Sequence, residues 1–230
     1  MSKKYEEKAK LLADKKPLSP EEAVKMLKST TWAKFVESAD LAIKLNLDTA
    51  KGGVSIRGVV SLPHGSGKVN RVAVITSADK VGEAQKAGAA VAGSEDLIEK
   101  ISKGFLDFDV LIATPDMMGQ VGKLGKTLGT KGLMPNPKSG TVTPDIAKAV
   151  GEFKSGKVEF RMDKGGVVHM LFGKVNLGED QLLANFNTAV NAILKTKPSG
   201  TKGNYFKSMT VSTTMGPGIP VETRSYLAQS

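Results

Sequence analysis

Hydrophobic and polar residues alternate in the first and the last thirds of the chain. Every second residue from Leu41 to Leu47 is leucine or isoleucine, and small or polar residues lie between them. This period of two predicts a strand with one buried face. Further strands are predicted over residues 55–62, 158–162, 167–172 and 205–213. Five apolar residues also share one face of a predicted helix: Leu182, Leu183, Phe186, Val190 and Ile193.

The pattern is different in the middle of the chain. Val72–Ile75 and Val110–Ala113 are short, continuous apolar runs, typical of strands covered on both faces. A short strand is predicted at residues 91–92. Helices are predicted over residues 79–88, from Ser94 to about residue 103, and from Thr143-Pro144-Asp145 to Gly156. Strands that alternate with helices at this spacing predict a small α/β domain with a parallel sheet.

These two patterns predict two domains. A discontinuous α+β domain of the split β-α-β type is expected from residues 1–67 and 158–230. A Rossmann-like α/β domain, residues 68–157, is expected as an insertion in it. The cluster of Pro63, Gly65 and Gly67 near one crossing is a candidate hinge, so we expect the domains to move relative to each other.

Two signals near the N-terminus are local. Residues 3–16 are predicted to form a basic amphiphilic helix or arm. Ser19-Pro20-Glu21-Glu22 has the residues of a capping box, with proline at the first helical position. A helix is therefore expected to run from there to about Lys28.

Composition narrows the classes of protein. Of 230 residues, 40% are hydrophobic, which is enough to bury a core. No run of 18 apolar residues is present, and the polar N-terminus lacks the apolar centre of a signal peptide, so no membrane association is expected. There is no cysteine, and His64 and His169 are the only histidines. We therefore expect no disulfide, no metal site and no other cofactor.

Charge favours an anionic partner. The net charge is +10, from 33 basic and 23 acidic residues, and such an excess favours polyanions through counterion release. Two long stretches, residues 117–144 and 181–221, contain lysines and no acid. Their lysines are Lys123, Lys126, Lys131 and Lys138 in the first, and Lys195, Lys197, Lys202 and Lys207 in the second.

Two segments resemble parts of enzymes. Gly125-Lys126-Thr127 is like the end of a phosphate-binding P-loop, but Gln120 stands where that motif needs glycine. Thr114-Pro115-Asp116 follows a buried strand, where α/β enzymes often place active groups, yet it equally predicts a helix start with Thr114 as N-cap. No catalytic triad, HExxH helix or dinucleotide fingerprint is present. We predict that the protein is not an enzyme, and a phosphate- or nucleotide-binding α/β enzyme remains the alternative.

Two other segments are unusual in composition. Residues 131–142 hold two prolines and two glycines. They predict a stiff loop in which Leu133 and Met134 pack inward and Lys131 and Lys138 face outward. Residues 212–217 combine hydroxyl side chains with Gly216 at a strand end, which would permit the close approach of a sugar-phosphate backbone.

Five blocks together resemble the L-one family of ribosomal proteins, of bacterial and organellar type, found in the mobile stalk of the large subunit. The resemblance runs in order over essentially the whole chain. The blocks are Ala33–Ser38, Arg57–Gly65, Phe108–Asp116, Lys131–Lys138 and Ser212–Pro217.

The resemblance implies a monomer within the ribosome, in the cytoplasm or in an organelle, with no small-molecule substrate. It implies that the discontinuous domain binds stalk ribosomal RNA, that the stalk helps deacylated tRNA to leave the exit site, and that the protein represses its own messenger RNA. The positions that match the family's RNA contacts are Lys34, Phe35, Ser38, His169, Ser208, Thr213, Thr214, Met215 and Gly216. The lysines at 123, 126, 131 and 138 are expected to make secondary RNA contacts.

The chain departs from the family's pattern in two places. Thr130-Lys131 stands where the family usually has Pro-Arg, so a bidentate phosphate contact is in doubt there. Residues 49–55 lack the family's usual Pro, Asp and Gln, and no role is transferred to them. A free RNA chaperone or repressor that acts away from the ribosome remains a further alternative.

Overall fold

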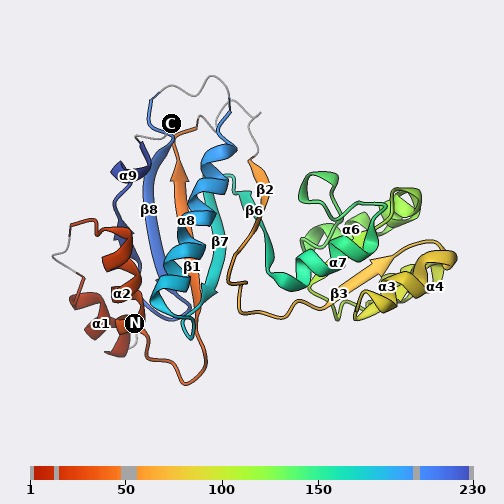
Figure 1. The fold of residues 1–230 in the computed structure, drawn as a ribbon, viewed down its shortest axis with the longest axis horizontal. Helices are drawn as coiled ribbons and strands as arrows, with labels where there is room; N and C mark the ends of the chain where they lie inside the picture. The colour runs from red at the N-terminus through yellow and green to blue at the C-terminus, as the bar shows by residue number, and fades with distance from the viewer. Residues whose placement is uncertain (1–2, 13–15, 48–55, 199–202, 228–230) are drawn as a thin grey trace. The chain divides into compact units, whose positions relative to one another are not determined.

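The computed structural model describes residues 3–12, 16–47, 56–198 and 203–227. The chain is a mixed α/β protein with two sheets (Figure 1). It divides into two compact units: unit 1 is Met1–Lys68 with Val158–Ser230, and unit 2 is Val69–Lys157. Lys202 and residues 49–55, which were considered above, lie outside the described residues.

Unit 1 contains a six-stranded sheet in the order β2-β6-β7-β1-β8-β9. The central strand β1 is antiparallel to both β7 and β8. Its strands are β1 (Ser38–Leu45), β2 (Arg57–Ser61), β6 (Lys157–Met162), β7 (Val167–Lys174), β8 (Phe206–Thr213) and β9 (Ile219–Val221). Its helices are α1 (Lys3–Lys10), α2 (Pro20–Thr30), α8 (Glu179–Lys195) and α9 (Arg224–Leu227).

One face of this sheet is covered by helices. Helix α8 packs on β2 and β7, and α2 packs on β8, β9 and α8 (Figure 1). Alternate residues of β1, from Ala39 to Leu45, are buried against these helices, as the period of two predicted. The rings of Phe172 in β7 and Phe186 in α8 meet edge to face at 5.7 Å. The other residues of β1 lie on the uncovered face, which we call the open face.

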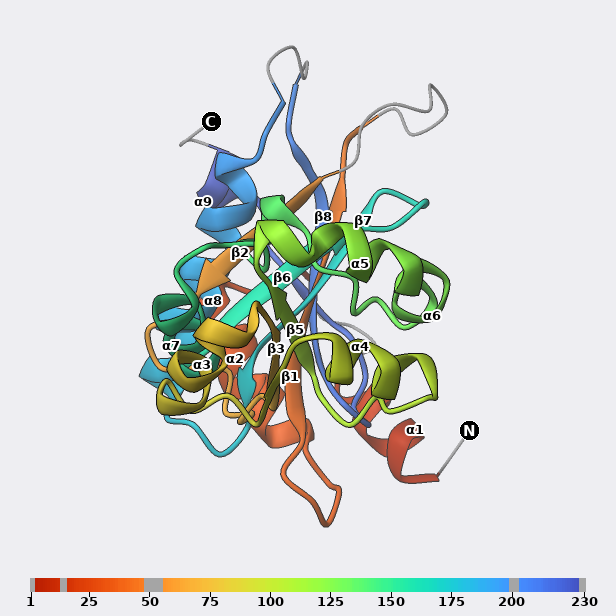
Figure 2. The ribbon, with the colours of Figure 1, turned by 90° about the vertical axis from the view of Figure 1, so that its right-hand side faces the viewer.

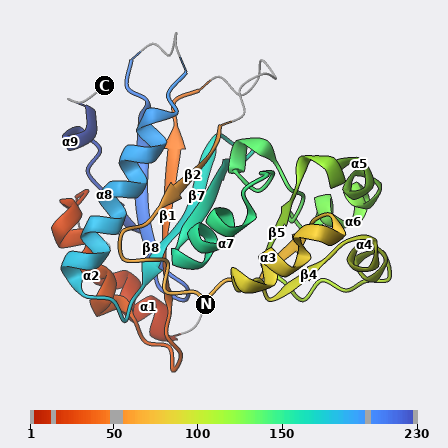
Figure 3. The ribbon, with the colours of Figure 1, turned by 45° about the vertical axis from the view of Figure 1, so that its right-hand side comes forward.

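Unit 2 contains a parallel three-stranded sheet in the order β4-β3-β5, so the prediction of a parallel sheet here is confirmed. Helices α3 and α7 lie on one face and α4, α5 and α6 on the other (Figures 2 and 3). All four residues of β3 are buried, as expected of a strand covered on both faces. The strands are β3 (Val72–Ile75), β4 (Val91–Gly93) and β5 (Val110–Ala113). The α-helices are α3 (Val81–Lys86), α4 (Glu95–Ser102), α5 (Met118–Val121), α6 (Gly125–Thr130) and α7 (Ile146–Ser155). Four 3₁₀ segments are η2 (Ala78–Lys80), η3 (Pro115–Met117), η4 (Gly122–Leu124) and η5 (Pro137–Ser139).

Most of the local predictions about helix ends and loops are confirmed. The capping box at Ser19 is present, because its hydroxyl accepts from the Glu22 amide and the Glu22 carboxylate accepts from the Ser19 amide. Asp145 caps α7, which ends at Gly156 in the left-handed conformation. Leu133 and Met134 pack against the core of unit 2.

Other predictions about local structure are wrong. Segment η3 begins at Pro115 as expected, but the Thr114 hydroxyl makes no capping hydrogen bond and is buried. Ser94 likewise precedes α4 without a side-chain cap. The edge strand β9 and the short helix α9 were not predicted.

Candidate nucleic-acid interface

Two loops meet at one end of the central strands of unit 1. Residues 31–37 lead into β1, and residues 214–216 follow β8. Because β1 and β8 are antiparallel, with Ala39 opposite Thr213, the start of one strand lies beside the end of the other. We call these two loops, together with Ser38, the two-loop site.

A buried carboxylate joins the two loops. Glu37 has no exposed surface. Its Oε1 accepts hydrogen bonds from the amides of Trp32 at 3.2 Å and Ala33 at 2.9 Å, and its Oε2 accepts from the amide of Met215 at 3.2 Å. Hydrogen bonds to an ionised acceptor are about twice as strong as neutral ones, so Glu37 fixes the shape of both loops.

The surroundings of Glu37 favour its ionised form. Burial alone would raise the pKa of its carboxyl. The nearby Thr213 hydroxyl, although it makes no full hydrogen bond, and the three backbone amides act in the opposite direction. Their combined effect is larger, and the pKa lies below its ordinary value of 4.5. Glu37 was not among the predicted site residues, because the partner through which it joins the two loops, Met215, is 178 positions away in the sequence.

The turn after β8 is also held from within the protein. The Ser38 amide donates to the Thr214 hydroxyl oxygen at 2.9 Å, which leaves the hydroxyl hydrogen of Thr214 able to donate to a partner. A Cβ on Gly216 would lie 2.3 Å from the Thr213 hydroxyl oxygen. A side chain on Gly216 would therefore force Thr213 to move, so the packing of the turn itself favours glycine here.

The two-loop site presents apolar side chains to solvent. Six large hydrophobic residues are exposed in the described part of the chain, and three of them belong to these loops. Phe35 is 55% exposed, Val36 50% and Met215 45%. Exposed Lys34 lies next to them in sequence. Apolar surface next to a cation suits a partner with flat, apolar rings and anionic groups, as nucleic acids have.

The open face continues from this site along the sheet. His169 of β7 and Thr210 of β8 both lie opposite Ala42 of β1, and Ser208 lies opposite Lys44. His169 Nε2 is 3.8 Å from Asp163 Oδ2. Burial raises the pKa of Asp40, and the nearby His169 only partly opposes that shift.

The structure brings most of the predicted contact residues of unit 1 onto one surface. Lys34, Phe35, Thr214 and Met215 are exposed at the two-loop site, where Ser38 and Gly216 are half-buried. His169 and Ser208 are exposed further along the open face. Thr213 differs, because it is only 3% exposed and its side chain packs inside the turn.

The four lysines expected to make secondary contacts lie in unit 2 and are exposed: Lys123, Lys126, Lys131 and Lys138. Gly122 and Gly125 have helical backbone angles at the join of α5, η4 and α6. The segment that resembles a P-loop is thus part of a helical run, whereas a P-loop connects a strand to a helix.

Two kinds of feature are absent from the described residues. They contain no group of three or more acidic or histidine side chains placed to hold a metal ion. None of their helices combines the length and the apolar character needed to span a membrane.

A comparison with protein families agrees with the geometry. The family model described as Ribosomal protein L1p/L10e family matches residues 27–217. The match covers more than half of the chain and includes both loops of the candidate interface.

Proposed function

Because this chain belongs to the Ribosomal protein L1p/L10e family, and so is a constituent of the large ribosomal subunit, we propose that unit 1 binds stalk ribosomal RNA through the two-loop site and the open face. The observation that carries this proposal is that the buried carboxylate of Glu37 accepts hydrogen bonds from both loops. It orders two loops that expose Phe35, Thr214 and Met215 together. Loops ordered before binding lose little conformational entropy when RNA binds.

Each exposed group has a matching part of RNA. Phe35 packs against ribose or base edges, the Thr214 hydroxyl donates to a 2′-OH, and Lys34 contacts phosphate. Recognition in this form depends on RNA shape and on the 2′-hydroxyl more than on base sequence. Thr213 supports the turn rather than contacting RNA, since it is buried.

The two units are proposed to act as two domains with separate tasks. Unit 1 provides the primary RNA affinity. Unit 2 adds secondary contacts through its exposed lysines at 123, 126, 131 and 138, which act as point charges on phosphates. Movement between the domains would help deacylated tRNA to leave the exit site. Repression of its own messenger RNA would use the same surface of unit 1.

Variants of the two-loop site test the proposal. Thr214→Val removes one hydroxyl at constant side-chain volume, and we expect weaker binding to stalk RNA by about 1–3 kcal/mol. Lys126→Ala is the control, because the nucleotide-binding alternative would make that lysine critical. A large loss for Lys126→Ala with no loss for Thr214→Val would favour the alternative.

Salt dependence and sedimentation test the partner. Affinity for stalk RNA should fall steeply as salt rises, and part of it should remain because it depends on RNA shape. Equal affinity for unrelated duplex RNA across the salt series would exclude a specific site. The protein should also sediment with large ribosomal subunits, which a chaperone or repressor acting away from the ribosome would not do.

A further inference from the structure

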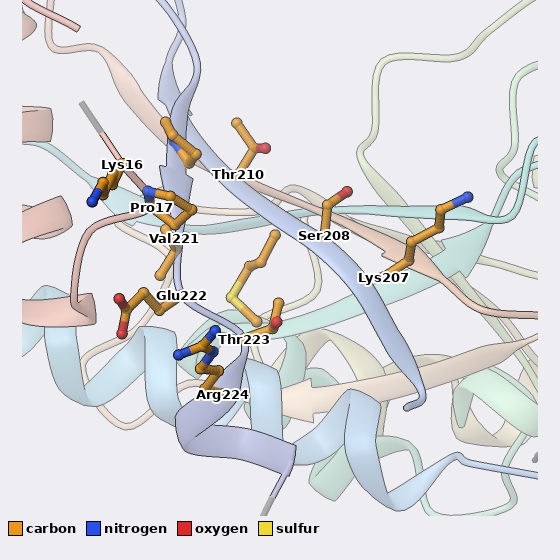
Figure 4. Close-up of a pocket in the computed structure, with 11 residues that line it drawn as sticks. Lys16, Pro17, Lys207, Ser208, Thr210, Val221, Glu222, Thr223 and Arg224 are labelled. Atoms are coloured by element: carbon orange, nitrogen blue, oxygen red, sulfur yellow. The ribbon is translucent and has the colours of Figure 1, made fainter. Parts of the chain in front are cut away.

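A groove opens at the β9 edge of the six-stranded sheet. Strand β9 pairs with β8 only over Met209–Val211, because the chain leaves the sheet after Val221. The start of β8 therefore extends past the end of β9. The groove, with a volume of about 480 Å³, lies between this part of β8, residues 16–17 and residues 222–224 (Figure 4).

Three of the four charged side chains around this groove are cationic. Lys16, Lys207 and Arg224 line it and are exposed, and Glu222 is the single carboxylate among the lining residues. None of these four residues makes an ion pair with another residue that the structure describes. Three cations and one anion leave a local charge of +2, which attracts an anion.

The other lining groups suit a ribose-phosphate backbone rather than a bare anion. Ser208 and Thr210 offer hydroxyls, and Pro220 and Val221 contribute apolar surface. Arg224 carries a planar fork of donors that can bind a phosphate through two hydrogen bonds. A sugar presents both hydroxyls and apolar carbon atoms, so the mixed lining matches it.

The groove is continuous with the interface proposed above. Ser208, Thr210 and Ser212 alternate along β8 and lie on the open face. They form a row of hydroxyls that leads from Thr214 to the groove. Six residues at ~3.3 Å each span roughly 20 Å, about the length of six nucleotides of a helical strand at ~3.4 Å per nucleotide.

Most of the groove lies outside the part of the chain that the family model matches. That match ends at residue 217 and begins at residue 27, whereas the groove takes Lys16 and Pro17 from before it and residues 220–224 from after it. The groove therefore combines β8, which lies inside the match, with segments that lie outside it.

We propose that this groove is a second RNA-binding site, which holds the ribose-phosphate backbone of a strand that continues from the two-loop site. The inference rests on the proposed RNA-binding function of unit 1. Arg224 and Lys207 contact phosphates, and Ser208 and Thr210 bond to ribose hydroxyls. The site adds affinity for longer RNA without adding base specificity.

The test compares two RNAs on the full chain. One is a short stalk RNA that fills only the two-loop site, and the other carries a single-stranded extension of six nucleotides. For the extended RNA, Arg224→Ala and Lys207→Ala should each weaken binding roughly five- to ten-fold at ~50 mM salt. Each should also reduce the slope of log affinity against log salt by about 0.7. Binding of the short RNA should be unchanged.

The control variant is Lys25→Ala. Lys25 is an exposed lysine on α2, the helix that packs on the covered side of the sheet. The variant should therefore bind both RNAs as tightly as the unmodified protein does. Ultraviolet crosslinking of the extension to Lys207 or to residues 220–224, which lie outside the two-loop site, is a second readout that needs no variant.

Three results would overturn the inference. In the first, both groove variants bind the extended RNA as tightly as the unmodified protein does. In the second, they lose equal affinity for the short and the extended RNA. In the third, polyglutamate displaces the extension as effectively as RNA does. The last result would identify a general anion site. Failure of the unmodified protein to bind the short RNA is a separate result, which counts against the proposed function itself.

Discussion

At the residue scale, the candidate interface depends on a side chain that is not exposed to solvent. Glu37 holds the Trp32, Ala33 and Met215 amides within hydrogen-bonding distance. An alanine at this position would leave three backbone donors without their acceptor, and an unpaired buried polar group costs about 1–3 kcal/mol. The residues that would touch RNA are thus positioned by one that does not.

We expect Glu37→Ala to lower the free energy of unfolding by on the order of 3 kcal/mol and to weaken binding of stalk RNA, because both loops lose their common anchor. Denaturant unfolding and an RNA-binding titration measure the two effects. Glu21→Ala, at an exposed position on α2, is the control and should change neither. Wild-type RNA affinity in a folded Glu37→Ala variant would show that Glu37 is not needed to hold the two loops in the shape that binds RNA.

The stabilisation by Glu37 should depend on pH in a defined direction. The pKa of Glu37 in the folded protein lies below its ordinary value of 4.5. A carboxyl of this kind stabilises the fold fully above its unfolded pKa, and the stabilisation is lost as pH falls through the folded pKa. The difference in unfolding free energy between wild type and Glu37→Gln should therefore stay constant from pH 7 to about 5 and shrink below 4.5. Urea unfolding over a pH series measures it, and a difference that grows on acidification would contradict the assignment.

Gly216 should be sensitive for a reason inside the protein. A Cβ there would come within 2.3 Å of the Thr213 hydroxyl oxygen, so Gly216→Ala should destabilise the protein by about 1–3 kcal/mol and weaken RNA binding. Thermal unfolding and RNA titration measure both. Adding Thr213→Ala removes the clashing oxygen and should restore most of the stability. No restoration in the double variant would mean that the glycine is needed for another reason.

At the scale of elements, α2 connects the capping box at Ser19 to the two-loop site, because its C-terminal end leads directly into residues 31–37. Ser19→Ala removes the hydroxyl that accepts from the Glu22 amide and should cost about 0.5–2 kcal/mol of stability. RNA affinity, measured where the variant is fully folded, should not change, because the hydrogen bonds from Glu37 to the two loops remain. Circular dichroism and RNA titration separate these effects, and an affinity loss without a stability loss would contradict this explanation.

Elements with local signals could be predicted from the sequence, and those that depend on distant partners could not. The capping box at Ser19 lies within four residues, so its pattern is readable. Strand β9 is three residues long and contains Pro220, which normally argues against a strand. It forms only because β8 on one side and Leu18 on the other provide partners.

The candidate site was predictable to a similar extent. Its exposed residues could be located by resemblance, because they lie in two contiguous blocks. The role of Glu37 could not, since its bond to Met215 joins residues 178 positions apart. Thr213 was predicted as a contact from the resemblance alone, whereas the alternation along β8 places its side chain on the buried face.

At the scale of the whole molecule, the two units have separate hydrophobic cores. One cluster of buried residues lies wholly in unit 1, and two clusters lie in unit 2 on the two faces of its sheet. Units with their own cores are able to fold alone.

Removing residues 69–157 and joining Lys68 to Val158 by a short linker should therefore leave a folded protein. It should keep the primary RNA affinity. The slope of log affinity against log salt should be smaller, because the exposed lysines at 123, 126, 131 and 138 are gone. Circular dichroism and RNA titration test this. A folded shortened protein that does not bind would place the primary site in unit 2.

The pairing of β1 with β8 also sets the order of events during synthesis. The amide of Ser38 and the hydroxyl of Thr214 are 176 positions apart, so the first half of the interface is made long before the second. A nascent chain, growing at ~5–20 residues per second, has no complete interface until the segment around Met215 has emerged. A partly made chain that lacks this segment therefore has only the first of the two loops, and the proposed two-loop site is complete only after residues 214–216 have been added.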